Sequence, residues 1–318
     1  MIIGHQKQWR FLKKSVELGK ISHAYLFCGE ERLGKKRIAL EFVKLINGGN
    51  FDLGHPDLIL IEPPTKNLVV GEIQIAQIRE LIRKLSLKPY SAPFKVALID
   101  QAHLMTKEAQ HSFLKTLEEP KGRTILILIT EAPERLLATI PSRCEIIKFS
   151  PVKEVEIKSY LREKLSDKDC EEASKFCLGR PGAAVDFVSD PQRLENRKKI
   201  IKELIKISNS GLASRFQFAK ELSKESNLKE ILEIWLSYFR NVLISKIENP
   251  NLYPNYGAHR RWDSNPPTTL LEGTSGGGRV SSFSKLKNIL SQIQNTSFLI
   301  STTNINSRLA LEILMLEL

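Results

Sequence analysis

The chain has 318 residues, enough for two or three domains, and 42% hydrophobic with 26% charged residues is an ordinary globular composition. No apolar run approaches the ~18 residues that a membrane span needs, and charges begin too early for a signal peptide, so we expect a cytoplasmic protein. The formal net charge of +12 favours a polyanionic partner such as nucleic acid.

Residues 1–150 alternate short apolar runs with amphipathic stretches. Continuous apolar strands separated by helices are typical of a parallel sheet that helices cover on both faces. The predicted strands are 23–29, 57–63, 94–100, 124–133 and 144–151, and the predicted helices include 35–48 and 73–89. We expect this domain to end at Pro151.

Strand signals disappear after Val152. Residues 152–190 predict two or three short helices, and residues 194–246 and 283–318 carry apolar positions at helical spacing. Residues 249–282 are rich in Pro, Gly, Asn and Ser, which predicts a long, flexible loop. The predicted domains are residues 1–150, 151–192 and 193–318.

The cysteines do not form a metal-binding pattern. Cys28, Cys144, Cys170 and Cys177 have neither C-x-x-C spacing nor a nearby histidine pair, as a structural zinc site would require. We therefore expect buried, reduced thiols and no zinc.

The segment "FCGEERLGKKRIA" (27–39) is close to the phosphate-loop pattern G-x-x-x-x-G-K-[ST]. Gly29, Gly34 and Lys35 match it, and backbone N–H groups at such a helix start bind phosphate oxygens. Lys36 stands where the pattern has the Ser or Thr that holds Mg²⁺. The alternative is a plain glycine turn before a helix.

The charged residues in and after this loop favour a loop that does not hydrolyse nucleotide. Lys35, Lys36 and Arg37 crowd the positive end of a helix, which is unfavourable without a compensating anion. Glu30 and Glu31 can supply that anion, and they would also repel a triphosphate. We interpret the loop as neutralised from within the chain.

A second motif is also altered. The run "FKVALID" ends in Asp100, which would deliver a carboxylate to Mg²⁺. The following residue, which should orient the attacking water, is Gln101, whose amide cannot act as a base. As an alternative, Asp100 caps the next helix.

The segment "ATIPSRCEIIKF" (138–149) predicts a turn at Thr139, Pro141 and Ser142, which presents Arg143 near the end of the sheet. From its spacing alone, Arg143 would be interpreted as a solvated surface charge.

Together these segments resemble the clamp-loader branch of the AAA+ ATPases. The matching segments are 4–39, 55–58, 95–120 ("KVALIDQAHLMTKEAQHSFLKTLEEP"), 136–144, 179–184 and 304–318. The resemblance implies an α/β fold: an AAA+ P-loop domain with a parallel sheet, a small helical lid and an all-α C-terminal collar domain. It also implies membership of a hetero-pentamer.

The resemblance assigns roles to individual residues. Arg143 would be an arginine finger that acts in the ATP site of a neighbouring subunit, an effect worth ~10³–10⁵ in rate in GTPases. Thr130 would be the sensor-1 residue of a degenerate nucleotide site with Gly29, Gly34, Lys35, Lys36 and Asp100. Gly182 stands where ATPase relatives have a sensor-2 arginine. Many relatives carry a zinc module that residues 46–57 lack.

The expected function is that of a rigid, non-hydrolysing clamp-loader subunit that requires no cofactor, although weak ATP or ADP binding remains open. Its expected partners are gamma, tau and delta subunits, the sliding clamp and, through the assembly, primed DNA. Candidates for DNA phosphate contact are Arg79, Arg83, Lys84, Lys88 and residues 115–123, with a solvated face as the alternative.

Two other functions stay open. One is an ATP-hydrolysing subunit of the gamma or tau type. The other is a DNA-binding adaptor outside replication, which would bind DNA tightly without partners.

Overall fold

The computed structural model describes residues 2–49, 51, 53–66, 69–225, 227–248, 280–302 and 305–318. Its contacts divide the chain into unit 1, Met1–Lys164 with Gly179–Val185, and unit 2, Leu165–Leu178 with Asp186–Leu318. The three predicted domains, with boundaries after residues 150 and 192, stay a prediction.

Unit 1 is built on five parallel strands. They are β1 (Ala24–Cys28), β2 (Leu58–Ile61), β5 (Lys95–Ile99), β6 (Thr124–Thr130) and β7 (Glu145–Lys148), in the order β2-β5-β6-β1-β7. The predicted parallel sheet is confirmed. A two-stranded antiparallel pair, β3 (Thr65–Lys66) and β4 (Val69–Val70), was not predicted, because its strands are too short to show a period.

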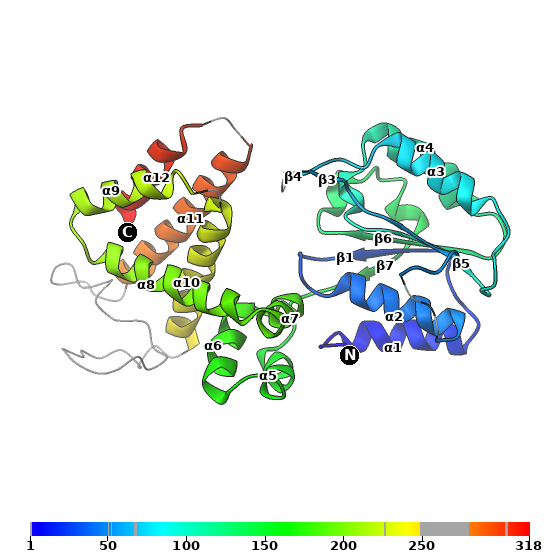
Figure 1. Ribbon diagram of the computed structural model, residues 1–318, viewed down its shortest axis with the longest axis horizontal. Coiled ribbons are helices and arrows are strands. Elements are labelled where there is room, and N and C mark those ends of the chain that lie inside the picture. Colours follow the sequence, from blue (N-terminus) through cyan, green and yellow to red (C-terminus); the bar gives the residue numbers. More distant parts are fainter. Residues whose placement is uncertain are drawn as a thin grey trace. The chain divides into compact units, whose positions relative to one another are not determined.

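Helices cover both faces of the sheet (Figure 1). One face carries α1 (Gln6–Glu17) and α2 (Lys35–Asn47), and the other carries α3 (Ile75–Leu85) and α4 (Lys107–Glu118). Alternate residues of one strand enter different cores: Tyr25 and Phe27 pack in the cluster of α1 and α2, whereas Leu26 packs in the cluster of α3 and α4. This explains why the strands are apolar without interruption.

The described part of the chain after β7 is mainly helical. Its helices are α5 (Glu154–Arg162), α6 (Asp167–Cys177), α7 (Pro181–Ser189), α8 (Pro191–Ser208), α9 (Leu212–Leu222), α10 (Leu228–Glu248), α11 (Val280–Thr302) and α12 (Ser307–Glu317). The largest buried side chains of unit 2 are Trp235 and Phe239 of α10, which pack with residues of α11 and α12.

Residues 249–279 of the predicted loop 249–282 lie outside the described residues. Its predicted end needs correction, because α11 already begins at Val280. The glycine run that suggested a loop ends at Gly278, and the serines that follow are residue types that the start of a helix accepts.

The lack of a membrane span and the burial of the cysteines are the other features expected from the sequence. In the part of the chain that the structure describes, no helix is long and apolar enough to cross a membrane. Cys28, Cys170 and Cys177 are buried and Cys144 is half-buried. Burial raises the pKa of the Cys144 thiol to about 12, so this group stays protonated at neutral pH.

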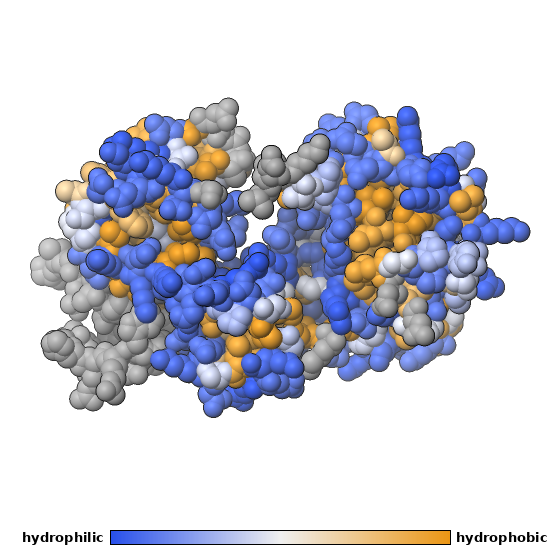
Figure 2. Space-filling model, viewed as in Figure 1, coloured by the Kyte–Doolittle hydropathy of each residue, from blue (hydrophilic) through white to orange (hydrophobic). Residues whose placement is uncertain are grey.

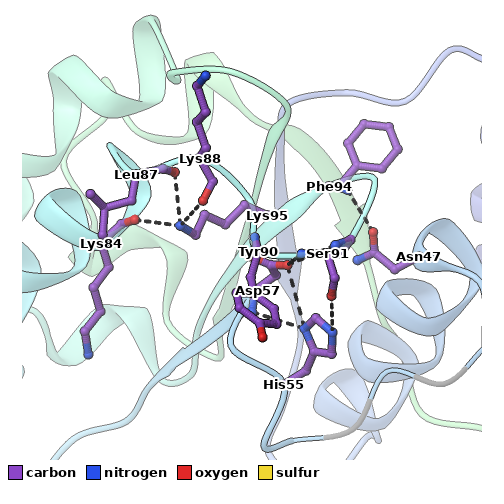
Figure 3. Close-up of polar contacts among 11 residues, drawn as sticks. Asn47, His55, Asp57, Lys84, Leu87, Lys88, Tyr90, Ser91, Phe94 and Lys95 are labelled. Carbon is purple, nitrogen blue, oxygen red and sulfur yellow. Dashed lines mark hydrogen bonds and ion pairs between the residues drawn. The ribbon is translucent and has the colours of Figure 1, made fainter.

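A pair of buried charges fixes the turn between α3 and β5 (Figure 3). The Asp57 carboxylate, 1% exposed, accepts hydrogen bonds from the backbone N–H groups of Tyr90, Ser91 and Ala92 at 2.7–3.0 Å. From the other side, the Lys95 ammonium donates to the carbonyls of Lys84, Leu87 and Lys88 at 2.9–3.4 Å. The turn therefore has a fixed backbone although its Tyr90 side chain is 82% exposed.

Replacing Asp57 by asparagine should lower the free energy of unfolding by roughly 1.5–3 kcal/mol, because an amide oxygen is a weaker acceptor for the backbone donors of residues 90–92. Burial alone would raise the pKa of Asp57, but the three N–H donors outweigh burial and hold this pKa below its usual value. The carboxylate therefore stabilises the fold above an unfolded-state pKa of ~3.9, and this contribution is lost as the pH falls through the folded-state pKa.

Urea unfolding of both proteins between pH 7 and pH 3 measures this effect. The difference between wild type and Asp57→Asn should shrink in acid. The control is Ser91→Ala, which removes only a 3.3 Å contact to His55 and should leave stability nearly unchanged. A difference that does not depend on pH would contradict the assignment.

Candidate functional site

Four strands of unit 1 place their carboxyl ends at one edge of the sheet. Gly29 follows β1, Glu62 follows β2, Asp100 follows β5 and Thr130 closes β6. In addition, the Gly29 N–H donates to the Thr130 carbonyl at 3.2 Å. Together with α2, this edge brings together Gly29, Gly34, Lys35, Lys36, Asp100 and Thr130, the predicted nucleotide-site residues. A parallel sheet with this arrangement commonly binds its ligand there.

Two glycines with positive φ shape the loop at residues 29–34, which precedes α2. Gly29 has φ +152°, and a Cβ atom at this position would lie 2.5 Å from the Phe149 carbonyl oxygen, so only glycine fits. Gly34, with φ +85°, precedes the first residue of α2. This requirement comes from the contact with Phe149, so the alternative of a plain glycine turn before a helix stays open.

Lys35 is bonded within its own loop. Its ammonium donates to the carbonyls of Gly29 and Glu30, at 2.5 Å each, and the residue is only 7% exposed. Burial lowers the pKa of Lys35, although the nearby carboxylates of Glu131 and Asp100 partly offset this effect. The lysine that would meet a phosphate is thus engaged with backbone oxygens.

Lys36 contacts two carboxylates. Its ammonium donates to Glu62 and lies 3.4 Å from Oδ2 of Asp100. Burial would lower the pKa of Lys36, but Glu62 and Asp100 outweigh burial and raise this pKa. Lys36 therefore remains protonated at neutral pH.

The compensating anions are those expected only in part, since the charge of Glu31 acts on Lys35 and raises its pKa against the effect of burial. The Glu30 carboxylate lies 2.9 Å from Arg180 instead of neutralising the loop lysines, and Arg37 pairs with Glu41 at 3.1 Å. The sequence analysis missed Glu62. The available signal was its position directly after a parallel strand, where the carboxyl edge gathers polar side chains.

Asp100 and Thr130 are held by groups of this chain. Oδ1 of Asp100 accepts from the Gln101 N–H at 3.0 Å, so the carboxylate supports the following turn and also faces Lys36. The Thr130 hydroxyl accepts from the Ala132 N–H at 3.1 Å and lies 3.4 Å from Nδ1 of His103. His103, 8% exposed, was also missed, because a single histidine carries no spacing signal.

Gly182 is needed for a close approach of the chain to the loop. Its N–H donates to the Arg32 carbonyl at 2.8 Å, and a Cβ atom at residue 182 would lie 2.8 Å from that oxygen. A side chain as long as arginine does not fit in this arrangement. The segment after Gly179 is thus tied to the loop by a backbone hydrogen bond and by the ion pair of Arg180 with Glu30.

Arg143 is not part of this group. It ends the 3₁₀ turn Pro141–Arg143 and precedes β7, which runs parallel to β1 with Tyr25 opposite Glu145. The amino ends of the strands therefore hold Arg143, whereas the loop lies at the carboxyl ends. The Arg143 guanidinium lies 2.6 Å from Glu118 and donates to the Thr139 carbonyl at 3.1 Å.

Metal binding has no support from side-chain clusters. Within the described ranges, no group of three or more His, Cys, Asp or Glu residues is placed to hold a metal ion. The absence of zinc stays a prediction.

Comparison with known proteins identifies the family. The family model described as "DNA polymerase III, delta subunit" matches residues 4–153. The delta prime subunit of DNA polymerase III from Bacillus subtilis (strain 168) is 32% identical over 260 residues, which cover 76% of this chain and 77% of that protein. The chain belongs to the DNA polymerase III delta prime family. This confirms the resemblance to clamp-loader subunits.

Gamma-type relatives are similar as well. A DNA polymerase III gamma subunit from Buchnera aphidicola subsp. Schizaphis graminum is 31% identical over 244 residues, 73% of this chain and 61% of that protein. Among solved structures, a DNA polymerase III gamma subunit-related protein from Thermotoga maritima aligns over 97% of both chains with 19% identity and a TM-score of 0.51. This similarity shows a shared fold, and the predicted fold class is confirmed.

Replacing Gly182 by alanine should destabilise the contact with the loop by about 1–3 kcal/mol, because the added methyl group meets a backbone carbonyl that cannot rotate away. Urea unfolding measures the loss, and amide hydrogen exchange at residues 29–34 should become faster. Gly54→Ala is the matched control, since a Cβ atom there meets nothing within 4 Å. Equal stability of the two variants would show that the close approach is not required.

Proposed function

We propose that this chain is the non-hydrolysing delta prime subunit of a clamp loader and that it supplies Arg143 to the ATP site of a neighbouring subunit. In this role it takes part in loading the sliding clamp onto primed DNA in the cytoplasm. The observation that carries the proposal is the position of Arg143 at the sheet edge opposite the phosphate loop of the same chain.

The two edges are separated by the length of a strand. β1 spans five residues between them, which corresponds to roughly 15 Å at ~3.3 Å per residue. A guanidinium must approach within hydrogen-bond distance of a phosphate to stabilise it. Arg143 therefore cannot serve the loop at Gly29–Lys35, and a function in catalysis requires a phosphate held by another chain.

The state of its own loop supports the absence of hydrolysis. Lys35 is engaged with backbone carbonyls, and Lys36 replaces the hydroxyl that would hold Mg²⁺. Gln101 stands where a general base would be needed, and an amide cannot fill that role. Weak binding of ATP or ADP is compatible with the retained backbone of the loop, and no cofactor is required for the proposed role.

Hydrolysis by this chain is the second candidate. It is favoured by the intact Gly29, Gly34 and Lys35 pattern and by the similarity to gamma and tau subunits, of which the tau subunit of Bacillus subtilis is 29% identical over 167 residues. That function would make the chain an ATPase of the gamma or tau type.

The partners follow from the family and from surface chemistry. We propose gamma or tau and delta subunits as neighbours in a hetero-pentamer. Unit 2 exposes apolar side chains along one side of α12, and hydrophobic residues reach the surface of this unit (Figure 2). These residues are Leu309, Ile313 and Leu316, 50–57% exposed and three or four positions apart. Such a row suits contact with another subunit.

Contact with DNA would be through the assembly. The net charge of +12 and the basic residues of α3 support an electrostatic contribution. Arg83 and Lys84 pair with Glu80 on the same helix, at 2.7 and 3.7 Å, and this carboxylate lowers the net positive charge of the helix face. We therefore expect weak DNA binding by the isolated chain.

In a reconstituted loader, Arg143→Ala should lower ATP turnover by the contribution of the one site that Arg143 serves, because a missing arginine finger costs ~10³–10⁵ at the affected site in GTPases while the other sites remain intact. Arg143→Lys should not restore turnover, since an ammonium cannot make two parallel hydrogen bonds to a phosphate. Steady-state phosphate release measures both variants. Arg162→Ala, at an exposed arginine of α5, is the control for loss of charge. Unchanged turnover in Arg143→Ala would remove the assignment.

The isolated chain, given Mg-ATP and primed DNA, should release no more phosphate than its Lys35→Ala variant. Both proteins lack the metal-binding hydroxyl and the general base, so removing the loop lysine has no activity to abolish. Turnover that depends on Lys35 would instead establish the gamma-like function.

A further inference from the structure

We propose that the Lys36 ammonium occupies the divalent-cation position of the phosphate loop, and that Lys36 is the residue that keeps Mg-nucleotide out of this site. The inference deepens the proposed function and rests on it, since both assign a site without hydrolysis to this chain.

The first argument is the convergence of oxygen donors on one point. β2 and β5 are adjacent and parallel, with Ile61 opposite Ile99, so Glu62 and Asp100 leave the sheet side by side. Both carboxylates turn toward the Lys36 ammonium, which is a direct partner of Glu62 and lies 3.4 Å from Oδ2 of Asp100. Carboxylate oxygens are the side-chain donors that Mg²⁺ prefers, so a cation of this chain sits where such an ion would find its ligands.

The second argument is that the acceptors are held in place. Oδ1 of Asp100 is engaged with the Gln101 N–H, and the Asp100 side chain is only 18% exposed, so Oδ2 has a fixed direction. The backbone carbonyl of Glu62 accepts from Nε2 of Gln77 in α3 at 3.3 Å, which fixes the main chain where β2 ends. The Asp100 carboxylate is thus held toward Lys36, whereas the Glu62 side chain is 49% exposed and only its backbone is fixed.

The third argument is position in the motif. Lys36 directly follows Gly34 and Lys35, at the place where the Ser or Thr of a phosphate loop contacts the metal. An ammonium at this place lacks the hydroxyl ligand, and it also repels a divalent cation that approaches the same two carboxylates. Arg37 points to a different partner, since it pairs with Glu41 one turn further along α2. The effect is therefore specific to residue 36.

The consequence is a site whose cation is covalently part of the chain. Any nucleoside diphosphate or triphosphate that entered the loop would meet Lys36 instead of Mg²⁺. Binding would then be independent of Mg²⁺, and the in-line arrangement that the metal provides for phosphate transfer would be missing.

The test compares ADP binding by the full-length chain with chelator and with Mg²⁺, measured by titration calorimetry. Wild-type protein should show no dependence on Mg²⁺. Lys36→Ser restores the hydroxyl, frees Glu62 and Asp100, and should gain at least about tenfold in ADP affinity when Mg²⁺ is added. Lys36→Met removes the charge without supplying the hydroxyl and should gain less. Arg37→Met is the matched control and should behave as wild type.

Two further measurements make the result specific. With ADP present, Mn²⁺ should be immobilised by Lys36→Ser and not by wild type, as seen by electron paramagnetic resonance. Adding Glu62→Gln to Lys36→Ser should abolish the gain. Mg²⁺-dependent binding by wild type overturns the proposal. The proposal is also overturned if Lys36→Ser shows no Mg²⁺-dependent gain in ADP affinity. This covers a variant that binds ADP equally well with chelator and with Mg²⁺, and a variant that does not bind ADP at all. The experiment uses this chain alone, so a failed arginine-finger assignment in the loader would be recognised separately.

Discussion

Charge balance at the carboxyl edge of the sheet is the constraint on which unit 1 depends. Three cations begin α2, at the positive end of that helix, and each must find oxygen acceptors without a ligand. Lys35 uses backbone carbonyls of the loop, Lys36 uses the carboxylates that follow β2 and β5, and Arg37 uses Glu41 in the next turn. The geometry of an anion-binding loop is thus kept with its charges satisfied inside the chain.

This balance also sets the position of the neighbouring segment. Glu30 is not needed by the lysines, so its carboxylate is available to Arg180. The Arg180 pair and the Gly182 backbone contact with Arg32 then join the start of α7 to the loop. Direct contacts make the connection, and the glycine is required because the two backbones are only one hydrogen bond apart.

Much of this could be predicted from the sequence, for physical reasons. Apolar runs predicted the strands, because β1, β5 and β6 are buried along their whole length between helices on both faces, whereas β7 is mostly exposed. The residues around the loop could be grouped, because parallel strands end at one edge. The partners of the charges could not be predicted. Whether Glu30 or Glu62 meets a lysine depends on the directions of side chains from separate elements, which the sequence does not encode locally, and the helices α1 and α4 were not among the predicted elements.

The retained loop has a structural reason that does not involve ATP. The Gly29 N–H bonds to the end of β6, and the Phe149 N–H donates to the Cys28 carbonyl at 2.7 Å, so the start of the loop continues the hydrogen-bonded ladder on both sides of β1. The same ladder sets the register of β7 against β1 and thereby the place of the turn that carries Arg143. A change that collapsed the loop would shift β7, because a Cβ atom at Gly29 already meets the Phe149 backbone. If Arg143 acts on a neighbour as proposed, then its placement also depends on the loop at the opposite edge, through the ladder that joins β1 and β7.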